Sequence, residues 1–508
     1  MNPDRIPVLV GVGEVIDRSR DPATAKEPLQ LMLDALAEAE RDAGAALLAA
    51  LDSLDVVCEY SWPYIDAPGM IAARLGVSPR HALYGETGGE SPVRFIHEAA
   101  LRIQRGESAV AAIVGGEAAY TTAAAWKAGV TLNWAARDAK AKLLTGREFS
   151  AQTAIDHGVA VPTNVYPFYE NATQAHWGQT PEAALAESGQ IWSAFSKVAA
   201  GSPAAWGQEA FTAEEIVQPS EKNRLIAWPY TKRMVANPLV NQGAAVLLTS
   251  LAKARELGIA EEKLIYLRGG AAASEPRDYL QRDQYHESHA QNAVLNAATR
   301  IAGGEAQAFT AMELYSCFPC VPKMARRTLK LPVTAPMSVT GGLSFFGAPL
   351  NNYMTHAAAN LVRALRGQPQ ALGLLYGQGE YVTKHHALVF ATTPGEGQAL
   401  PESYSVQAEA DARRGTVPPL LTDYSGPATL ETFTIVYTRE GQPECGTVIA
   451  RTPTGERLMA RVPASDSTAM ALLTRLDAQP VGAVGEVSRL DAKRLKWSLP
   501  DEPSRAAK

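Results

Sequence analysis

The sequence predicts an α/β fold built from two similar halves, with a small β domain after them. Short β-prone apolar runs alternate with segments of helical periodicity from residue 1 to about 258, and again from 259 to 397. In each half one helix begins directly after a glycine-rich turn. Beyond residue 426, apolar and polar residues alternate in short runs between turn residues, which is typical of antiparallel strands.

The first half, residues 1–258, is expected to contain a parallel sheet. A glycine-rich turn, a helix over 91–106 and a buried strand at 109–114 make a βαβ unit. The other elements expected here are strands at 6–12, 54–60 and 237–250 and a helix at 28–43. Between about 120 and 235 the regularity is lost, apart from amphipathic patches such as 183–198, so a loop domain covering the sheet is expected.

The second half, residues 259–397, repeats this pattern. Its elements are predicted as strands at 264–267, 308–314, 372–375 and 386–391 and helices at 288–301 and 351–366. Residues 398–426 are rich in Pro, Gly, Glu and Ala and are interpreted as a linker. Strands at 430–437, 446–451, 457–462 and 485–490 then predict a small, mostly antiparallel β domain over 427–508, with a barrel as one way to close it.

The composition limits the classes of protein to which the chain can belong. A chain of 508 residues with 46% hydrophobic and 20% charged residues is ordinary for a soluble globular protein. The net charge of −6 argues against a protein that wraps nucleic acid. Four cysteines make no disulfide framework, and no apolar run reaches about 18 residues or forms a secretory segment. We therefore expect a cytoplasmic protein without a membrane span.

The stretches that suit a ligand pocket are 85–92, 311–320, 339–349 and 375–380. The second places Glu313, Tyr315 and Cys317 within five residues. The others are rich in glycine, which lets the backbone turn sharply and approach a ligand closely. Ser91 is predicted as the N-cap of the helix over 91–106, whose N-terminus would direct backbone N–H groups at a ligand. The question is how the four stretches share one pocket.

In these features the chain resembles the thiolase superfamily, and within it the proteins related to sterol-carrier thiolases. The resemblance covers about 5–395, and some relatives carry an added C-terminal domain of OB type. It implies a duplicated, five-layered αβαβα core with a loop domain and an acyl-coenzyme A (acyl-CoA) ligand. It also implies a homodimer through the first half, or a monomer where the added domain blocks that face.

The catalytic residues of the family are replaced in this chain. The nucleophilic cysteine expected near Gly89 to Ser91 is absent, and so is the second cysteine expected near 376–378. Tyr315-Ser-Cys-Phe318 stands where the family has Asn-Glu-Ala-Phe or His-Asp-Cys-Phe. Gly347-Ala-Pro349 stands where the family has Gly-His-Pro. The thiolate nucleophile, its activating histidine and the acid/base cysteine are therefore all missing from their expected places.

Several residues remain candidates for chemistry at these positions. The catalytic candidates are Tyr315, Cys317, Tyr376 and Ser91. The candidates for substrate binding are Gly89, Gly347, Ala348, Pro349, Lys222 and Arg224. A phenol can pass a proton or hold an oxyanion, whereas a buried cysteine or tyrosine can equally serve packing alone. Cys317-Phe-Pro-Cys320 has redox spacing but lacks further zinc ligands, so we expect no metal and no permanently bound cofactor.

Two classes of function follow. One is an acyl-CoA-dependent enzyme that makes or breaks carbon–carbon bonds, either as an acyltransferase like acetyl-CoA acetyltransferase or as a retro-aldol lyase that uses tyrosines. The other is an acyl-CoA-binding protein without catalysis. We expect the enzyme, an acyltransferase in the first place, with the retro-aldol lyase and the binding protein as the alternatives.

Overall fold

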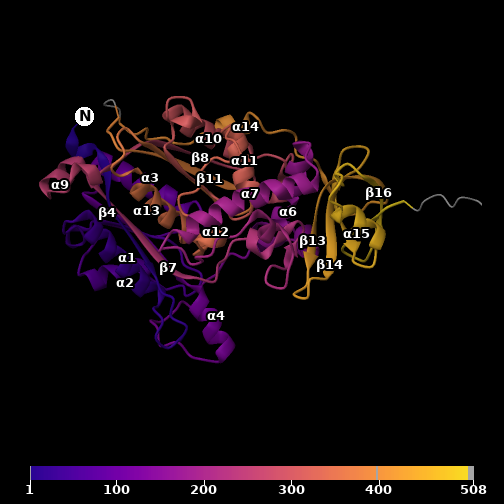
Figure 1. Ribbon diagram of the computed structural model, residues 1–508, viewed down its shortest axis with the longest axis horizontal. Coiled ribbons are helices and arrows are strands. Elements are labelled where there is room, and N and C mark those ends of the chain that lie inside the picture. Colours follow the sequence, from indigo (N-terminus) through magenta and orange to yellow (C-terminus); the bar gives the residue numbers. More distant parts are fainter. Residues whose placement is uncertain (1, 396–398, 501–508) are drawn as a thin grey trace, which may run out of the picture.

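The computed structural model describes residues 2–395 and 399–500. The predicted boundary at residues 397 and 398 lies outside the described residues, as do positions 501–508 of the predicted β domain. The molecule is elongated, with an α/β core at one end and a β barrel at the other (Figure 1).

The centre of the core is one mixed sheet of nine strands, in the order β3-β2-β4-β7-β1-β8-β11-β10-β9. The strands of the first half are β1 (Pro7–Ile16), β2 (Ser53–Val56), β3 (His81–Tyr84), β4 (Val110–Ala118) and β7 (Asn241–Ser250). Those of the second half are β8 (Ile265–Ser274), β9 (Ala311–Leu314), β10 (Leu372–Gly379) and β11 (Lys384–Ala391). The predicted parallel unit is present as β2, β3 and β4, but β7 and β1 are antiparallel, so the sheet is mixed.

The two halves repeat one topology. In the first half β1, β7, β4 and β2 are neighbours in that order, with two antiparallel pairs and then a parallel one. In the second half β8, β11, β10 and β9 follow with the same order and directions. Within the described residues no strand of the second half corresponds to β3. The halves meet at a short antiparallel contact between β1 and β8, where Val8 pairs with Tyr266.

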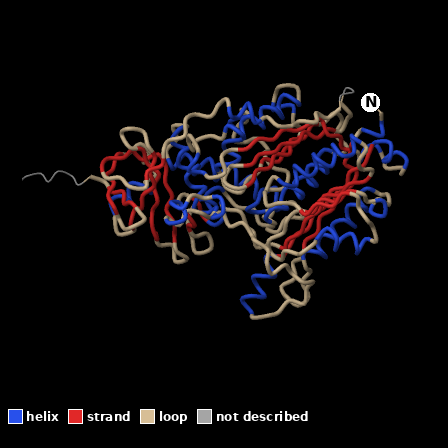
Figure 2. The backbone as a smooth tube through the Cα atoms, turned by 180° about the vertical axis from the view of Figure 1, so that it is seen from behind, coloured by secondary structure: helices blue, strands red, loops and turns tan. Residues whose placement is uncertain are grey.

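Helices fill the space between the two halves of the sheet and cover their outer faces. The helices α3 (Ser91–Arg105) and α13 (Tyr353–Leu365) pack against each other in the middle (Figure 2). Both bury residues around much of their circumference, as a helix between two sheets must. Outside lie α1 (Pro28–Ala43), α2 (Ala67–Leu75) and α9 (Leu251–Glu256) on the first half, and α10 (His289–Ile301) and α11 (Cys320–Thr328) on the second. The result is the expected five-layered αβαβα core.

The insertion in the first half is more regular than its sequence predicts. It contains α4 (Ala119–Ala128), α5 (Gln152–Asp156), α6 (Pro162–His176), α7 (Pro181–Ala200) and α8 (Ala213–Val217), and the short strands β5 (Leu225–Ala227) and β6 (Tyr230–Thr231). Proline at the first position begins both α6 and α7. Periodicity fails to reveal α6 because it is buried on several sides, so polar residues such as Glu170 and Asn171 also face the interior.

The C-terminal domain is a closed five-stranded barrel. Its strands are β13 (Gly426–Tyr437), β14 (Pro443–Arg451), β15 (Arg457–Pro463), β16 (Val484–Arg489) and β17 (Leu495–Ser498), with α15 (Ser467–Thr474) between β15 and β16. Pairing runs β13-β14-β15-β17-β16 and back to β13, so the ring closes. Strand β17 was not predicted. Its Trp497 is fully buried in the barrel and needs Gly485, where an added Cβ would lie 2.2 Å from the indole.

The barrel is fixed to the core through α6 and the loop before α10. Asn171 donates a hydrogen bond to the Phe433 carbonyl (2.8 Å), and Thr432 donates one to the Phe168 carbonyl (2.5 Å). The fully buried Arg457 of the barrel donates to carbonyls of the core, among them that of Leu280 (3.1 Å). These buried hydrogen bonds hold the barrel against the core.

The predicted linker runs along the second half of the core. It contains α14 (Gln407–Asp411), which packs on α10, and β12 (Leu420–Leu421), which pairs with β15. Ser405 forms a bridge with Ala272 of β8. The described part of this segment is thus packed along its length.

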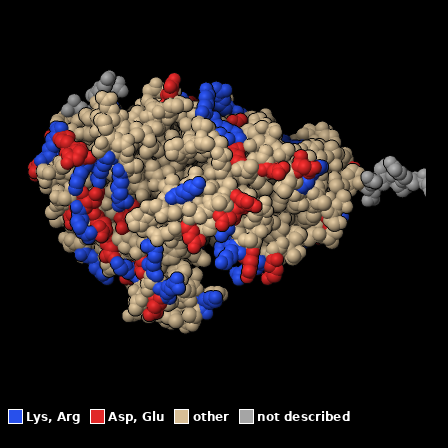
Figure 3. Space-filling view, in the orientation of Figure 1, with Lys and Arg blue, Asp and Glu red and all other residues tan. Residues whose placement is uncertain are grey.

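The surface carries charges of both signs. Figure 3 shows acidic and basic side chains interspersed over the core end of the face in view. No helix in the described part of the chain has the length and hydrophobicity needed to cross a bilayer.

Candidate active site

A pocket of about 400 Å³ lies where the four predicted stretches meet, and we call it the central pocket. Its walls come from Thr87–Gly89 before α3, from Tyr315 and Cys317 after β9, from Ala348 after the glycine turn and from Gln378 to Tyr381 at the end of β10. The helix α6 and residues 144–149 close one side. The fold therefore brings together stretches from both halves, at the end of the strands where an α/β fold presents its chemistry.

Gly89 and Tyr315 face each other across the pocket wall. A Cβ added at Gly89 would lie 2.5 Å from the Tyr315 hydroxyl and 2.5 Å from the Gln378 carbonyl oxygen. Only glycine fits at this place, and the fit puts the phenol against the backbone that leads into α3. The Gly89 N–H makes no hydrogen bond with any described residue. A ligand oxygen at this point can therefore meet both an O–H and an N–H donor.

The Tyr315 side chain is buried, lines the central pocket and packs edge-on against the Tyr353 ring. Its hydroxyl has no hydrogen-bond partner within the part of the chain that the structure describes. Burial raises the Tyr315 pKa well above its usual value, and the neighbouring Cys317 and Glu90 raise it further. The hydroxyl therefore stays protonated at neutral pH and acts as a donor.

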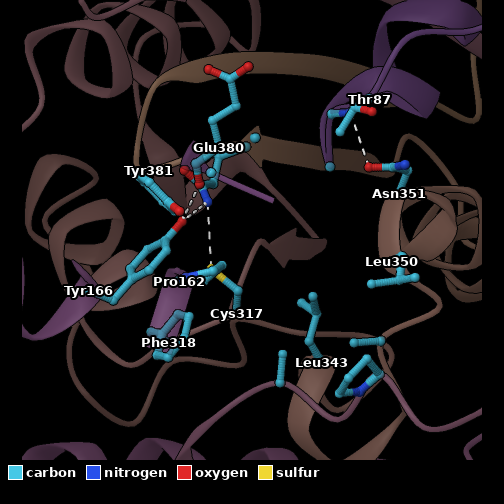
Figure 4. A pocket seen from close by; sticks show the side chains of 18 of the residues that line it. Thr87, Pro162, Tyr166, Cys317, Phe318, Leu343, Leu350, Asn351, Glu380 and Tyr381 are labelled. Atoms are coloured by element: carbon cyan, nitrogen blue, oxygen red, sulfur yellow. Dashed lines mark hydrogen bonds between the residues drawn. The ribbon is translucent and has the colours of Figure 1, made fainter. Parts of the chain in front are cut away.

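A short chain of polar groups joins Cys317 to Tyr166 (Figure 4). Gln378 contributes its side-chain amide to both Cys317 Sγ (3.5 Å) and the Tyr166 hydroxyl (2.6 Å), and that hydroxyl donates to the Glu380 carbonyl (2.7 Å). Burial raises the Cys317 pKa to about 12. The thiol is protonated at neutral pH and is a poor nucleophile.

Asn351, from the second half of the core, forms hydrogen bonds to the first half at the wall of the pocket. Its Oδ1 accepts a hydrogen bond from the Gly88 N–H (3.1 Å), and its Nδ2 donates to the Cys58 carbonyl (2.9 Å). Figure 4 shows Asn351 beside Thr87 on the wall opposite Tyr166. This residue, which follows the glycine turn in sequence, holds the loop before α3 at the pocket.

Glu90 is a buried carboxyl group next to the pocket that sequence reasoning missed. It is 6% exposed, and its Oε2 has no hydrogen-bond partner among the described residues. An added Cβ would lie 2.5 Å from that oxygen at Gly88 and 2.0 Å at Gly379, two glycines that line the pocket. Burial raises the Glu90 pKa, which Lys384 partly offsets. The signal available in the sequence was an acidic residue inside a glycine-rich turn directly before a helix.

Two predicted catalytic residues do not line the pocket. Ser91 is the first residue of α3 and not its N-cap, which is Glu90, and the buried Ser91 hydroxyl donates to the Glu86 carbonyl (3.2 Å). The Tyr376 hydroxyl lies on the other side, where it accepts a hydrogen bond from Gln291 (2.9 Å) and contacts His385 Nδ1 (2.8 Å). Both hydroxyls are thus engaged in the protein interior.

The predicted binding residues lie in different places. Gly89 and Ala348 line the central pocket, whereas Gly347 and Pro349 do not. Lys222 lines a separate cavity of about 950 Å³, the loop-domain cavity, together with Lys232 and Arg233. This cavity shares Val235, Ala236 and Pro238 with the central pocket, so the two adjoin. Arg224 lines neither and donates to the Leu225 carbonyl (3.0 Å).

Metal and disulfide chemistry have no support in the described residues. They contain no group of three or more His, Cys, Asp or Glu side chains that could hold a metal ion. Cys58, Cys317, Cys320 and Cys445 are free thiols. Among the described residues that line the central pocket, Cys317 is the one thiol and none is a histidine.

Known proteins similar to this chain agree with its two-part architecture. The additional C-terminal domain of thiolase-like protein type 1 matches residues 405–491. The crystal structure of a monomeric SCP2-thiolase like protein type 1 from Mycobacterium smegmatis has a TM-score of 0.82 and 29% identity, covering 98% of this chain and 99% of that one. No curated protein matches the sequence at a significant level.

More distant structures share the core alone. The Ltp2-ChsH2(DUF35) aldolase has a TM-score of 0.59 at 18% identity, over 76% of this chain and 98% of that one. The human mitochondrial 3-ketoacyl-CoA thiolase in complex with CoA has a TM-score of 0.53 at 16% identity, over 77% of this chain and 98% of that one. The duplicated core, the closed barrel and these matches lead to one conclusion: this chain is a thiolase-like protein with an added C-terminal domain.

Proposed function

We propose that this protein cleaves a carbon–carbon bond in an acyl-CoA thioester without forming a covalent acyl-enzyme, and that retro-aldol cleavage of a 3-hydroxyacyl thioester is its reaction. The observation that carries the proposal is the Tyr315 hydroxyl, which lines the central pocket beside the Gly89 N–H without a partner among the described residues. These two donors suit an oxygen on which negative charge develops.

A covalent route is poorly supported by the same pocket. Acyl transfer through a thioester needs a thiolate and a base that activates it. Cys317 has a pKa raised to about 12 by burial, and no described lining residue is a histidine. An acyltransferase mechanism, which the resemblance also allows, therefore lacks an activated thiolate among the described residues of this pocket.

The retro-aldol reaction needs a base and an oxyanion site; the pocket offers the oxyanion site, and the Glu90 carboxyl group beside it is the candidate base. Glu90, in its ionised form, would accept the proton of the substrate 3-hydroxyl, directly or through one water. The bond between C2 and C3 then breaks, C3 becomes a carbonyl, and the electron pair moves to C2 and the thioester oxygen. Tyr315 O–H and Gly89 N–H would hold that oxygen. Return of the proton from Glu90 to C2 releases a shortened acyl thioester and an aldehyde or ketone.

The loop-domain cavity suits the rest of a coenzyme A ligand. It adjoins the central pocket, and Lys222, Lys232 and Arg233 supply positive charge for phosphate groups. The human thiolase of the same fold is described in complex with CoA, and another protein of this fold is an aldolase. The thiolase-like neighbour with the same added domain is described as monomeric, which supports a monomer here as well.

The test is incubation with 3-hydroxyacyl-CoA and 3-ketoacyl-CoA esters, with and without free CoA, followed by mass spectrometry of the products. We expect cleavage of a 3-hydroxyacyl ester that does not require free CoA. Tyr315→Phe should lower the rate about 10²-fold or more while ligand binding persists. Tyr376→Phe is the matched control, because it removes a buried tyrosine hydroxyl outside the pocket and should retain turnover. Equal turnover in wild type and Tyr315→Phe would refute the proposal.

A second candidate is an acyl-CoA-binding protein without catalysis. It is favoured by one observation: burial raises the pKa of both Tyr315 and Glu90, so both groups are disposed to stay protonated. Tight binding of acyl-CoA esters without turnover of any ester in the panel would select this candidate.

A further inference from the structure

A second cavity, of about 440 Å³, lies between the core and the barrel, and we call it the core–barrel cavity. The core contributes His157, Gly158 and Asn164, from the end of α5 and the start of α6. The barrel contributes residues of β13, β14 and β15 and of the β16–β17 connection. Figure 1 shows α6 beside the barrel. The central pocket and this cavity share no lining residue.

Two arginines of the barrel line this cavity. Arg461 forms no ion pair with a carboxylate of the described residues; it contacts Cys445 Sγ and lies 3.5 Å from Thr447 Oγ1. The Arg494 guanidinium forms an ion pair with the Asp491 carboxylate, at 2.6 Å. The one acidic side chain among the described lining residues is Glu444, which is exposed. The cavity therefore presents one guanidinium group, that of Arg461, that forms no ion pair with a described residue.

His157 adds a hydrogen-bond acceptor from the core side. It is 1% exposed, and its Nδ1 donates to the Thr153 carbonyl (2.7 Å), which leaves Nε2 as an acceptor. That Nε2 has no partner within the described residues. Burial, together with the smaller effect of the Arg461 and Arg494 charges, lowers the His157 pKa to about 4. A buried acceptor without a donor is costly unless a ligand or water supplies one.

We propose that the core–barrel cavity is a second ligand site, which takes a small anion that also carries an O–H group. The anionic oxygens face Arg461 and Arg494, and the O–H donates to His157 Nε2. A phosphate that retains a proton and a short hydroxy acid share this chemistry. Sulfate has the charge but no proton at neutral pH, so it lacks the donor. The proposal does not depend on the reaction at the central pocket.

The site is placed to influence the central pocket. His157, Gly158 and Asn164 line the core–barrel cavity, whereas Pro162, Thr163 and Tyr166 line the central pocket. One continuous segment of ten residues, 157–166, thus forms a wall of each. An anion held between this segment and the barrel would restrain the side of the central pocket that Tyr166 forms.

Binding is tested by calorimetry on the full chain at pH 7, with inorganic phosphate, glycolate and sulfate as probes. We expect phosphate or glycolate to bind at least tenfold more tightly than sulfate. Arg461→Gln should weaken that binding about 10-fold or more, because it removes a charged hydrogen-bond donor to the anion. Arg489→Gln, which removes an exposed arginine of the same barrel, is the matched control and should bind as wild type.

Other outcomes overturn the proposal. If Arg461→Gln binds all three anions as wild type does, the cavity is not their site. Loss of phosphate binding in Lys222→Gln, with normal binding in Arg461→Gln, would place the anion in the loop-domain cavity instead. Should Arg461→Gln fail to fold, Arg494→Gln provides the same comparison, and unchanged binding in that variant counts against the site. Equal affinity for sulfate and phosphate would remove the role of His157.

Discussion

Gly89→Ala is the change that tests the geometry of the central pocket most directly. The new Cβ would lie 2.5 Å from the Tyr315 hydroxyl and 2.5 Å from the Gln378 carbonyl oxygen. The carbonyl belongs to β10, where Gln378 pairs with His385 of β11, so this backbone can move only a little. The Tyr315 side chain must therefore move. To reach an ordinary contact of 3.4 Å, its hydroxyl has to shift by about 0.9 Å.

This shift sets the expected magnitudes. Overpacking of a well-packed site costs about 1–3 kcal/mol, which corresponds to a fall in Tm of about 2–10 °C. A catalytic group misplaced by about 1 Å can lose about 10²-fold in rate. If Tyr315 holds the developing oxyanion, Gly89→Ala should lower turnover by that order and leave binding at the loop-domain cavity intact.

The assay combines thermal unfolding with turnover of the best 3-hydroxyacyl-CoA substrate and titration with CoA. Gly201→Ala is the matched control, because an added Cβ there meets its nearest atom at 3.5 Å, an ordinary contact. It should unfold and turn over as wild type. A Gly89→Ala protein with unchanged Tm and unchanged turnover would show that Gly89 and Tyr315 are not in contact, and the site as described would be wrong.

Two further predictions concern buried charges. If Glu90 is the base, kcat/KM of the wild type should fall as the pH drops through the raised pKa of Glu90. The Glu90→Gln variant should be slow at every pH. If its kcat/KM still falls at low pH as that of the wild type does, Glu90 is not the base. Because that pKa is raised, folding also favours protonated Glu90, so wild type should lose stability relative to Glu90→Gln as pH rises. Lys323 and Glu170 form a fully buried pair at 2.5 Å. Lys323→Met should lower the free energy of unfolding, measured in urea, by about 3–5 kcal/mol. Adding Glu170→Gln should restore part of that stability. An unchanged free energy of unfolding in Lys323→Met would refute the pairing.

Local patterns in the sequence were sufficient for most of the architecture. The strand at β1, the helices α1 and α3, the glycine turns and the repetition of the halves all depend on neighbours a few residues apart. Periodicity and turn chemistry report such local features directly. That the four stretches around Gly89, Tyr315, Ala348 and Tyr376 belong together was implied by the resemblance to the thiolase superfamily.

Elements that violate local rules were missed. The strand β8 extends to Ser274 through Gly269 and Gly270, residues with low strand propensity. Glycine is required there, because an added Cβ at Gly270 would lie 2.5 Å from the Ala387 carbonyl of the neighbouring strand. That contact joins residues far apart in the chain, so no local window contains it.

The chemistry of the site was decided by the tertiary structure. On β10 every residue after Leu372 is buried, so no alternation of polar and apolar residues reveals that Tyr376 turns toward Gln291 while the pocket lies elsewhere. Glu90 became a candidate because Gly88 and Gly379, from opposite halves of the core, enclose its carboxyl group. Local sequence patterns indicated most of the strands, helices and glycine turns of the core. Which side chains share a cavity, and which pKa values burial shifts there, depended on long-range packing that sequence neighbours do not encode.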